Sequence, residues 1–157
     1  MSAQACILGV DPDLGDIAFY FEAEGVVSVD DMPVAAGDVD AATLAARIAQ
    51  MRPDIAIVEQ VASRPGQGVA SFKFGCGYGI VRGVIAASGV PLHFVSPAKW
   101  KRHFGLDADK EKSRALALRF WPTRADLFGR KRDHGRAEAA LIARYGAEHI
   151  MNGGGGQ

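Results

Sequence analysis

The sequence has few cysteines, no net charge and no long apolar segment. Cys6 and Cys76 are its only cysteines, and neither lies in a CxxC pair or at zinc-ligand spacing from histidines. Both thiols are therefore expected to be buried. The longest apolar run, residues 83–92, is too short and too rich in glycine and alanine to span a bilayer, and no signal peptide pattern precedes it. We expect a cytoplasmic protein with no membrane partner.

The length and composition predict one globular domain. A chain of 157 residues can bury a real core but has little room for a second one. Hydrophobic residues make up 48% and charged residues 23%, which is typical of soluble globular proteins. We expect the domain to cover residues 1–148 and a flexible, glycine-rich tail to cover residues 149–157.

The zero net charge conceals an uneven distribution along the chain. Residues 1–60 contain 11 acidic and 2 basic side chains, a net charge of −9, and the remaining residues contain 7 and 16, a net charge of +9. A basic second half is suited to contact a polyanion such as nucleic acid. Alternatively, the fold mixes the two halves again, because halves of a sequence need not be halves of the surface.

Apolar runs of strand length alternate with segments of helical periodicity. Strands are expected at residues 5–10, 17–21, 26–29, 54–58 and 91–95. Helices are expected at residues 41–51, capped by Asp40, and at 69–88, 97–104, 110–121 and 135–145, with loops at 61–68 and 124–132. This order predicts an α/β fold, in which a mixed five-stranded sheet is flanked by α-helices and begins with an antiparallel meander.

Three acidic residues lie where they can converge. Asp11 follows the apolar ILGV, Glu59 follows IAIV, and Glu138 lies within the otherwise apolar helical segment AEAAL. If the two strands are neighbours, their ends meet at one edge of the sheet, and a helix across that edge adds the third carboxylate. Such a cluster suits Mg²⁺ or Mn²⁺, and two ions at such a site can cleave a phosphodiester. The alternative is a turn residue, a solvated strand end and a water-facing helix residue.

These motifs resemble those of the RuvC-type Holliday junction resolvases. ILGVDPDLG is similar to the first-strand motif of that family, VEQV to its second acidic motif, and DHGRAEAALIARYG to its C-terminal acidic helix, most closely in the phage and organellar branch. VSPAKWKRHFGL and KEKSRALAL occur in the expected order between them. The resemblance covers residues 5–145.

The resemblance implies a ribonuclease H-like fold and a homodimer that makes paired nicks in a four-way DNA junction, with two Mg²⁺ or Mn²⁺ ions per active site and no organic cofactor. It implies that Asp11, Glu59 and Glu138 bind metal. Family members place an Asp or His shortly before the last acid, and Asp133 and His134 both meet that description. Asp133 is the harder ligand for Mg²⁺, whereas His134 lies one helical turn before Glu138. Asp13 stands where the family commonly has glycine, and is either close to the metals or a turn residue.

Basic and aromatic residues close to these motifs are candidates for DNA contact. We predict that DNA is bound by Arg64, Gln67, Ser71, Phe72, Lys73, Lys99, Lys101, Arg102, Lys110, Arg130, Lys131 and Arg136. Lys112 is predicted to be a catalytic cation beside the scissile phosphate, or else a solvated surface residue. Phe72 either inserts between bases or belongs to the core. Trp100 is expected to be buried.

The glycine-rich segment 69–88 offers small and aliphatic residues for packing. Ala70, Gly77, Val81, Val84 and Ile85 suit a two-fold interface between copies of the chain, although the glycines would equally suit packing on its own sheet. Other functions consistent with the same acids are a nuclease for structured RNA or an RNA–DNA hybrid and, if catalysis were lost, a junction-binding protein. An actin-like ATPase needs two such domains, and this chain is too short for that.

Overall fold

The computed structural model describes residues 4–12, 15–62, 66 and 68–151, and a five-stranded mixed sheet lies at its centre. The strand order is β3-β2-β1-β6-β7. The strands are β1 (Cys6–Asp11), β2 (Asp16–Phe21), β3 (Val26–Asp31), β6 (Ile55–Glu59) and β7 (Leu92–Val95). The first three pair antiparallel, whereas β1, β6 and β7 run parallel. The predicted fold class and the antiparallel meander are both confirmed.

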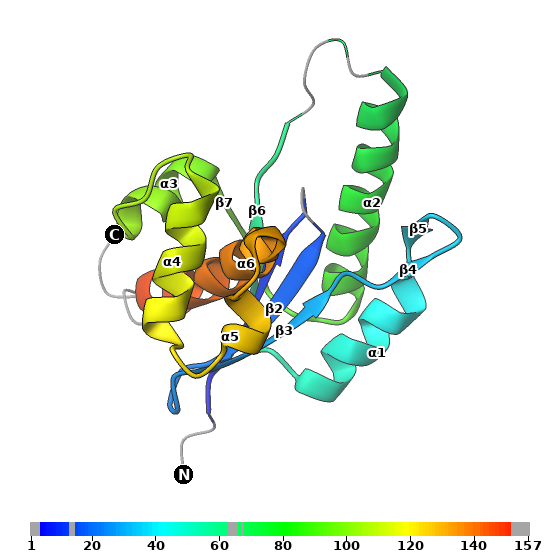
Figure 1. Ribbon diagram of the computed structural model, residues 1–157. Helices are drawn as coiled ribbons and strands as arrows, with labels where there is room; N and C mark the ends of the chain where they lie inside the picture. The colour runs from blue at the N-terminus through cyan, green and yellow to red at the C-terminus, as the bar shows by residue number, and fades with distance from the viewer. Residues whose placement is uncertain (1–3, 13–14, 63–65, 67, 152–157) are drawn as a thin grey trace.

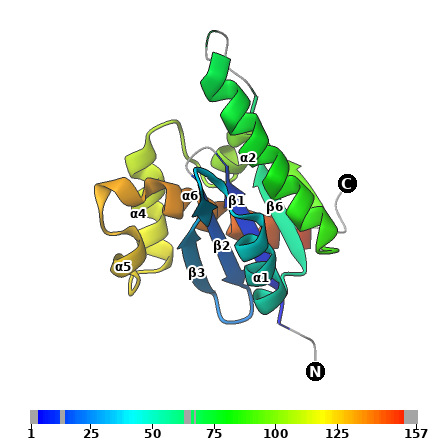
Figure 2. The ribbon, with the colours of Figure 1, turned by 90° about the vertical axis from the view of Figure 1, so that its right-hand side faces the viewer.

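Helices cover both faces of the sheet (Figure 1, Figure 2). One face is covered by α1 (Ala41–Met51) and α2 (Gly68–Ala87), and the other by α3 (Pro97–His103), α4 (Lys110–Phe120), α5 (Ala125–Phe128) and α6 (His134–Tyr145). Successive strand residues alternate between two cores, so that Leu8 and Val10 pack with α1 and α2 while Ile7 packs with α6. Within the described residues, no helix is both long and apolar enough to cross a membrane.

The boundaries of α1 follow the predicted cap, and α3 has a cap that was not predicted. The Asp40 side chain accepts a hydrogen bond from the backbone N–H of Thr43 at 3.1 Å, as expected of a residue that begins a helix. At the other end of α1, Arg52 adopts a left-handed conformation with φ 51°, and Pro53 follows it. The short helix α3 begins in the same way, because the Ser96 side chain accepts from the N–H of Lys99.

Three segments contain elements that were not predicted from the sequence. Residues 33–40 contain a small hairpin of β4 (Val34–Ala35) and β5 (Asp38–Val39). The predicted loop at 124–132 contains α5 and the start of a 3-10 turn, η1 (Lys131–Asp133), because Arg124 donates to the carbonyl of Val27 and anchors this segment to β3. After α6 the chain continues as η2 (Gly146–Met151), so the first residues of the predicted tail are helical.

Gly9 allows α6 to pack directly against β1. A Cβ atom at Gly9 would lie 2.4 Å from the carbonyl oxygen of Ala139 and 2.5 Å from the backbone nitrogen of Ala143. The small residues of α6 complete the contact, since Ala139, Ala140 and Ala143 are fully buried. The position of α6 over the sheet therefore depends on glycine at position 9. Because α6 carries Glu138, the same glycine sets how closely Glu138 approaches the sheet.

Candidate active site

Four carboxylates lie in a row across one end of the sheet. Val10 of β1 pairs with Val58 of β6, so Asp11 and Glu59 come next on neighbouring parallel strands. On the other side of β1, Asp11 is opposite Asp16 of β2, and Asp16 is opposite Asp31 of β3. Residues directly opposite each other point to the same face of a sheet. Alternation along β1 and β6 places this row on the face that α6 covers.

The three predicted metal-binding acids are buried rather than solvated. Asp11 is fully buried, Glu59 is 6% exposed, and Glu138 is 4% exposed on α6. Strand register places Asp11 beside Glu59, and α6, which carries Glu138, packs across β1 and β6. That all three acids meet at one metal site stays a prediction. The alternative of three solvent-facing residues does not hold, because burial of an ionised carboxylate requires a compensating partner.

Trp100 fixes the side chain of Glu59. Its indole Nε1–H donates to Oε2 of Glu59 at 2.7 Å, and both side chains are buried. The N-terminal cap and Pro97 set the start of α3, which brings Trp100 under the end of β6. Trp100 was expected to be buried, but its hydrogen bond to a candidate catalytic acid was not predicted.

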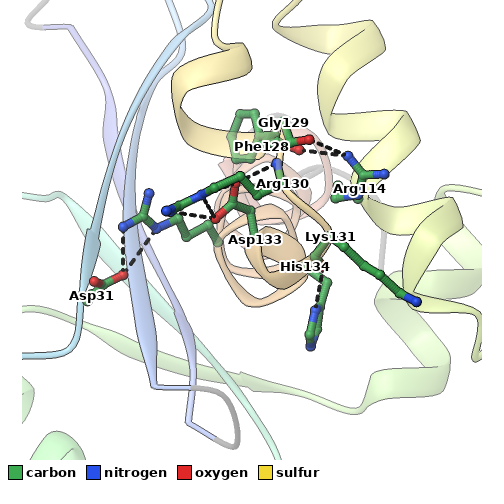
Figure 3. Close-up of polar contacts among 9 residues, drawn as sticks. Asp31, Arg114, Phe128, Gly129, Arg130, Lys131, Asp133 and His134 are labelled. Atoms are coloured by element: carbon green, nitrogen blue, oxygen red, sulfur yellow. Dashed lines mark hydrogen bonds and ion pairs between the residues drawn. The ribbon is translucent and has the colours of Figure 1, made fainter.

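Asp133 and His134 point in different directions (Figure 3). Asp133 is buried and receives hydrogen bonds from Arg130, through the backbone N–H at 2.8 Å and the guanidinium at 2.9 Å. Burial would raise the pKa of Asp133, but the hydrogen bonds from Arg130 outweigh it and hold that pKa below its usual value. His134 turns toward the carbonyl of Lys131, 3.2 Å from its Nδ1.

Asp133 lines a polar pocket together with Asp16 and Asp31, the two members of the carboxylate row on β2 and β3. The pocket has a volume of about 410 Å³ and is lined by Asp16, Asp31, Arg130, Arg132, Asp133 and Arg136. Arg136 pairs with Asp31 at 3.0 Å. The acidic first part of the chain and the basic second part therefore meet at this pocket. Of the two candidates for the fourth active-site position, only Asp133 lines it.

Asp16 is an unusual carboxyl group that the sequence did not single out. Burial, followed by a hydrogen bond and charge repulsion from Asp31 and by the charge of Asp11, raises the pKa of Asp16 to about 7, against the opposing effect of Arg136. In the unfolded chain the same group titrates near its ordinary value of 3.8. Folding therefore favours the protonated form, and this contribution to stability is lost as the pH rises from about 4 to about 7.

We predict that Asp16→Asn removes this pH dependence. At pH 8, in the presence of a chelator, the variant should exceed the wild-type free energy of unfolding by about 2 to 4 kcal/mol, and near pH 4 the two should converge. Urea unfolding at the two pH values measures the difference. Glu24→Gln, at an exposed position in the turn between β2 and β3, is the control. A difference between Asp16→Asn and the wild type that does not change with pH would contradict the assignment.

The donor set suits a hard divalent cation. The acids supply carboxylate oxygens only, and Oε1 of Glu138 is buried without a hydrogen-bond partner among the described residues. In the described part of the chain, however, no three His, Cys, Asp or Glu side chains lie close enough together to hold a metal ion. The residues fit a cation in donor type and burial, and holding one requires their side chains to move closer together.

The candidate DNA-binding residues form separate groups on the surface. Lys73 and Phe72 lie at the start of α2, where Phe72 is 75% exposed, which excludes the alternative that it belongs to the core. On α3, Lys99 and Arg102 are exposed, and the ammonium of Lys101 lies over the Trp100 ring. Ser71 is partly buried in α2. Arg64, Gln67 and Asp13 lie outside the described residues.

The structure joins two basic segments that are distant in the sequence. Lys110 at the start of α4 and Lys131 of η1 line one hollow of about 380 Å³, together with Arg132, His134 and the acidic Asp109 and Glu111. Lys112 does not line this hollow or the polar pocket, and its ammonium pairs with the exposed Asp107. Among the catalytic candidates, Lys112 and His134 are therefore not brought to the carboxylate row.

Comparison with known proteins identifies the fold. No protein-family model and no curated protein sequence matches the chain. Among solved structures, Thermus thermophilus RuvC in complex with a Holliday junction substrate superposes with a TM-score of 0.63 at 17% identity, over 94% of this chain and 96% of that one. The chain has a RuvC fold.

Two further structures agree with this. A Thermus thermophilus RuvC structure gives a TM-score of 0.61 at 19% identity, again over 94% and 96% of the two chains. The yeast mitochondrial Holliday junction resolvase gives 0.52 at 16% identity, over 97% of this chain and 84% of that one. The predicted resemblance to the RuvC type is thus confirmed for the fold over almost the whole chain.

Proposed function

We propose that this chain is a metal-dependent endonuclease that resolves four-way DNA junctions. The observation that supports it best is the burial of Asp11, Glu59 and Glu138 at one end of a RuvC-type sheet. Buried carboxylates repel one another and destabilise a fold unless cations compensate for their charge. A RuvC fold that buries these three acids is best explained by metal-dependent phosphodiester hydrolysis.

Each residue of the site has a distinct part in the proposed reaction. Asp11, Glu59, Glu138 and Asp133 would hold Mg²⁺ or Mn²⁺, which when bound supplies an activated water and stabilises the leaving 3′-oxygen. Trp100 orients Glu59 through its hydrogen bond. Arg130 and Arg136 line the polar pocket and pair there with Asp133 and Asp31, and in the proposed reaction they would exchange these partners for phosphates that flank the cleaved bond. The products would carry 5′-phosphate and 3′-hydroxyl ends.

A panel of nucleic acids tests this proposal. We predict that the chain makes paired, symmetric nicks in a labelled synthetic four-way junction with Mg²⁺ or Mn²⁺, and that a chelator abolishes them. Duplex DNA of the same sequence and a splayed single strand should remain intact. Cleavage of an RNA–DNA hybrid or of structured RNA instead would assign the site to a different nuclease, and tight junction binding without any cutting would leave only a binding function.

The proposed activity requires two active sites related by two-fold symmetry, and α2 offers a surface for dimer formation. The residues predicted for this role are partly wrong, because Val81 and Ile85 are buried in the core of their own chain and Val84 packs against it. Gly77 faces Val39 of the hairpin. The opposite face of α2 is exposed, and space is open around Gly75, Gly79 and Gly83, which recur every four residues. This face lets two backbones approach closely.

We predict that Gly79→Leu weakens the dimer by at least about tenfold, equivalent to about 1.4 kcal/mol. The leucine would separate the two helices, whereas its higher helix propensity leaves the monomer fold intact. Sedimentation equilibrium gives the dissociation constant. Gly79→Ala is the matched control and should remain dimeric. A monomeric wild-type chain, or a Gly79→Leu dimer of unchanged affinity, would show that this face is not the interface.

A further inference from the structure

A second pocket lies on the other face of the sheet from the candidate acids, close to the end of β1. It has a volume of about 280 Å³ and is bounded by the β4–β5 hairpin, by α2 and by Pro12 and Gly15. Most of its wall is apolar and includes Met32, Val39 and Tyr78. We call it the hairpin pocket. Its volume lies at the lower end of the range for ligand sites, which suits one planar ring system.

The hairpin gives this pocket a fixed wall. Two residues connect β4 and β5, and both have positive φ, 52° at Ala36 and 83° at Gly37. That is the conformation of a tight hairpin turn whose twist matches its strands. The N–H of Asp40 donates to the carbonyl of Pro33 at 2.8 Å and closes the base of the hairpin. The segment therefore forms a defined surface opposite α2.

Helix α2 contributes two aromatic rings and a glycine to the wall of the pocket. Phe74 and Tyr78 both line the pocket, and their rings lie 6.2 Å apart and nearly parallel. Gly77 lies on the same side of the helix and faces the hairpin, so that an added Cβ would contact the Val39 side chain at 3.4 Å. This side of α2 is opposite the exposed glycine face. A dimer formed through the glycine face would therefore leave the hairpin pocket accessible.

Two charged residues line the hairpin pocket. The Lys73 ammonium lies at the hairpin turn, 3.8 Å from the position of a Cβ on Gly37. Asp38 lines the same space and is exposed on β5. An apolar cavity with aromatic walls, a cation and a carboxylate that can accept from an amino group match the parts of a nucleotide.

We propose that the hairpin pocket binds a single unstacked nucleobase that carries an exocyclic amino group. Lys73 binds the phosphate of that nucleotide, the Phe74 and Tyr78 side supplies apolar contact, and the Asp38 carboxylate accepts a hydrogen bond from the amine. Cytosine, adenine and guanine carry such an amine, whereas thymine does not. The role of this pocket in choosing a cleavage site rests on the proposed function, and the binding of the base does not.

The first experiment measures nucleotide binding without any nuclease activity. Amide resonances of the ¹⁵N-labelled chain are followed during titration with dCMP and, separately, with dTMP. We expect dCMP to move the resonances of Gly37, Val39 and Gly77, and to bind about fivefold more tightly than dTMP because one hydrogen bond is lost with thymine. Absence of these shifts would overturn the proposal, and equal affinity for both nucleotides would overturn the part assigned to Asp38.

Two variants separate the parts of the pocket. Gly77→Leu fills the cavity from a helical position and should abolish the shifts with both nucleotides. The Asp38→Asn side chain can present either its carbonyl or its amino group to the base. The variant should therefore bind dCMP and dTMP with nearly equal affinity. Asp126→Asn, on the exposed part of α5, is the control and should match the wild type. Shifts that persist in Gly77→Leu would place the nucleotide elsewhere.

The second experiment uses four junctions that differ only in the base beside the crossover. Wild type should cut the thymine junction most slowly, and Gly77→Leu should cut all four at similar rates. Equal cleavage rates for the four junctions, together with no amide resonance shifts on addition of nucleotide, would refute base binding in the hairpin pocket. The proposed junction nuclease activity would still stand. Nucleotide shifts in a chain that cuts no junction would support the pocket and refute the proposed function.

Discussion

The Glu59→Gln variant is expected to bind a four-way junction as wild type does and to cut it about 10³-fold more slowly, a loss of about 4 kcal/mol of transition-state stabilisation. A neutral amide cannot compensate the charge of a divalent cation, but it has the same size as the carboxylate. Its carbonyl oxygen can still accept the hydrogen bond from Nε1 of Trp100, which is 2.7 Å long in the wild type.

The folded state should tolerate Glu59→Gln, because removal of one of several buried acids reduces their mutual repulsion. Thermal unfolding in the presence of a chelator should therefore show a melting temperature equal to that of wild type or above it. Glu24→Gln, at an exposed position in the turn between β2 and β3, is the matched control and should cut at the wild-type rate. If Glu59→Gln cut within threefold of wild type, Glu59 would not belong to the catalytic site.

The second large effect is expected from Gly9→Ala, which should lower the free energy of unfolding by about 3 kcal/mol. The added methyl group would meet the backbone of α6 at Ala139 and Ala143, at 2.4 and 2.5 Å. Backbone atoms of a packed helix cannot rotate away as a side chain can. Relief therefore requires α6 to move off β1, and this movement carries Glu138 away from the other acids.

A series of glycine substitutions measures this effect by urea unfolding. Gly146→Ala should also destabilise the fold, but less than Gly9→Ala, because its nearest obstacle at 2.5 Å is the buried Ile57 side chain rather than the backbone of a packed helix. Gly83→Ala on the exposed face of α2 meets nothing within 4 Å and should gain up to about 1 kcal/mol from helix propensity. If Gly9→Ala does not accumulate in soluble form while the other two variants do, the predicted order of stability still holds. Equal stability of all three would contradict the close contact.

Local patterns in the sequence were sufficient for most of the elements. Alternation and apolar runs located all five strands of the central sheet, and the cap at Asp40 located the start of α1. The same patterns missed the β4–β5 hairpin, because Ala36-Gly37 is not a typical sequence for a turn in which both residues have positive φ. They also missed α5, which has only four residues and depends on the anchoring of Arg124 to β3.

Burial was harder to predict than secondary structure. Cys76 was expected to be buried and is exposed, because it lies on the outer face of α2. The helix turns Val81 and Ile85 toward the sheet, where they join the core with Leu44 and Ile48 of α1. Helical periodicity in a segment rich in glycine does not identify which face packs inward, since small residues are compatible with either face.

By itself, the sequence determined the candidate chemistry of this protein. Asp11 and Glu59 end two apolar strands and Glu138 interrupts an apolar helix, and these positions predicted their convergence because parallel strands end at the same edge of a sheet. Only the tertiary structure decided which other groups join them. The register of β1, β2 and β3 aligns Asp16 and Asp31 with Asp11, and the η1 turn directs Asp133, rather than His134, toward that row. Strand register and helix entry depend on contacts between segments far apart in the chain, which no local pattern records.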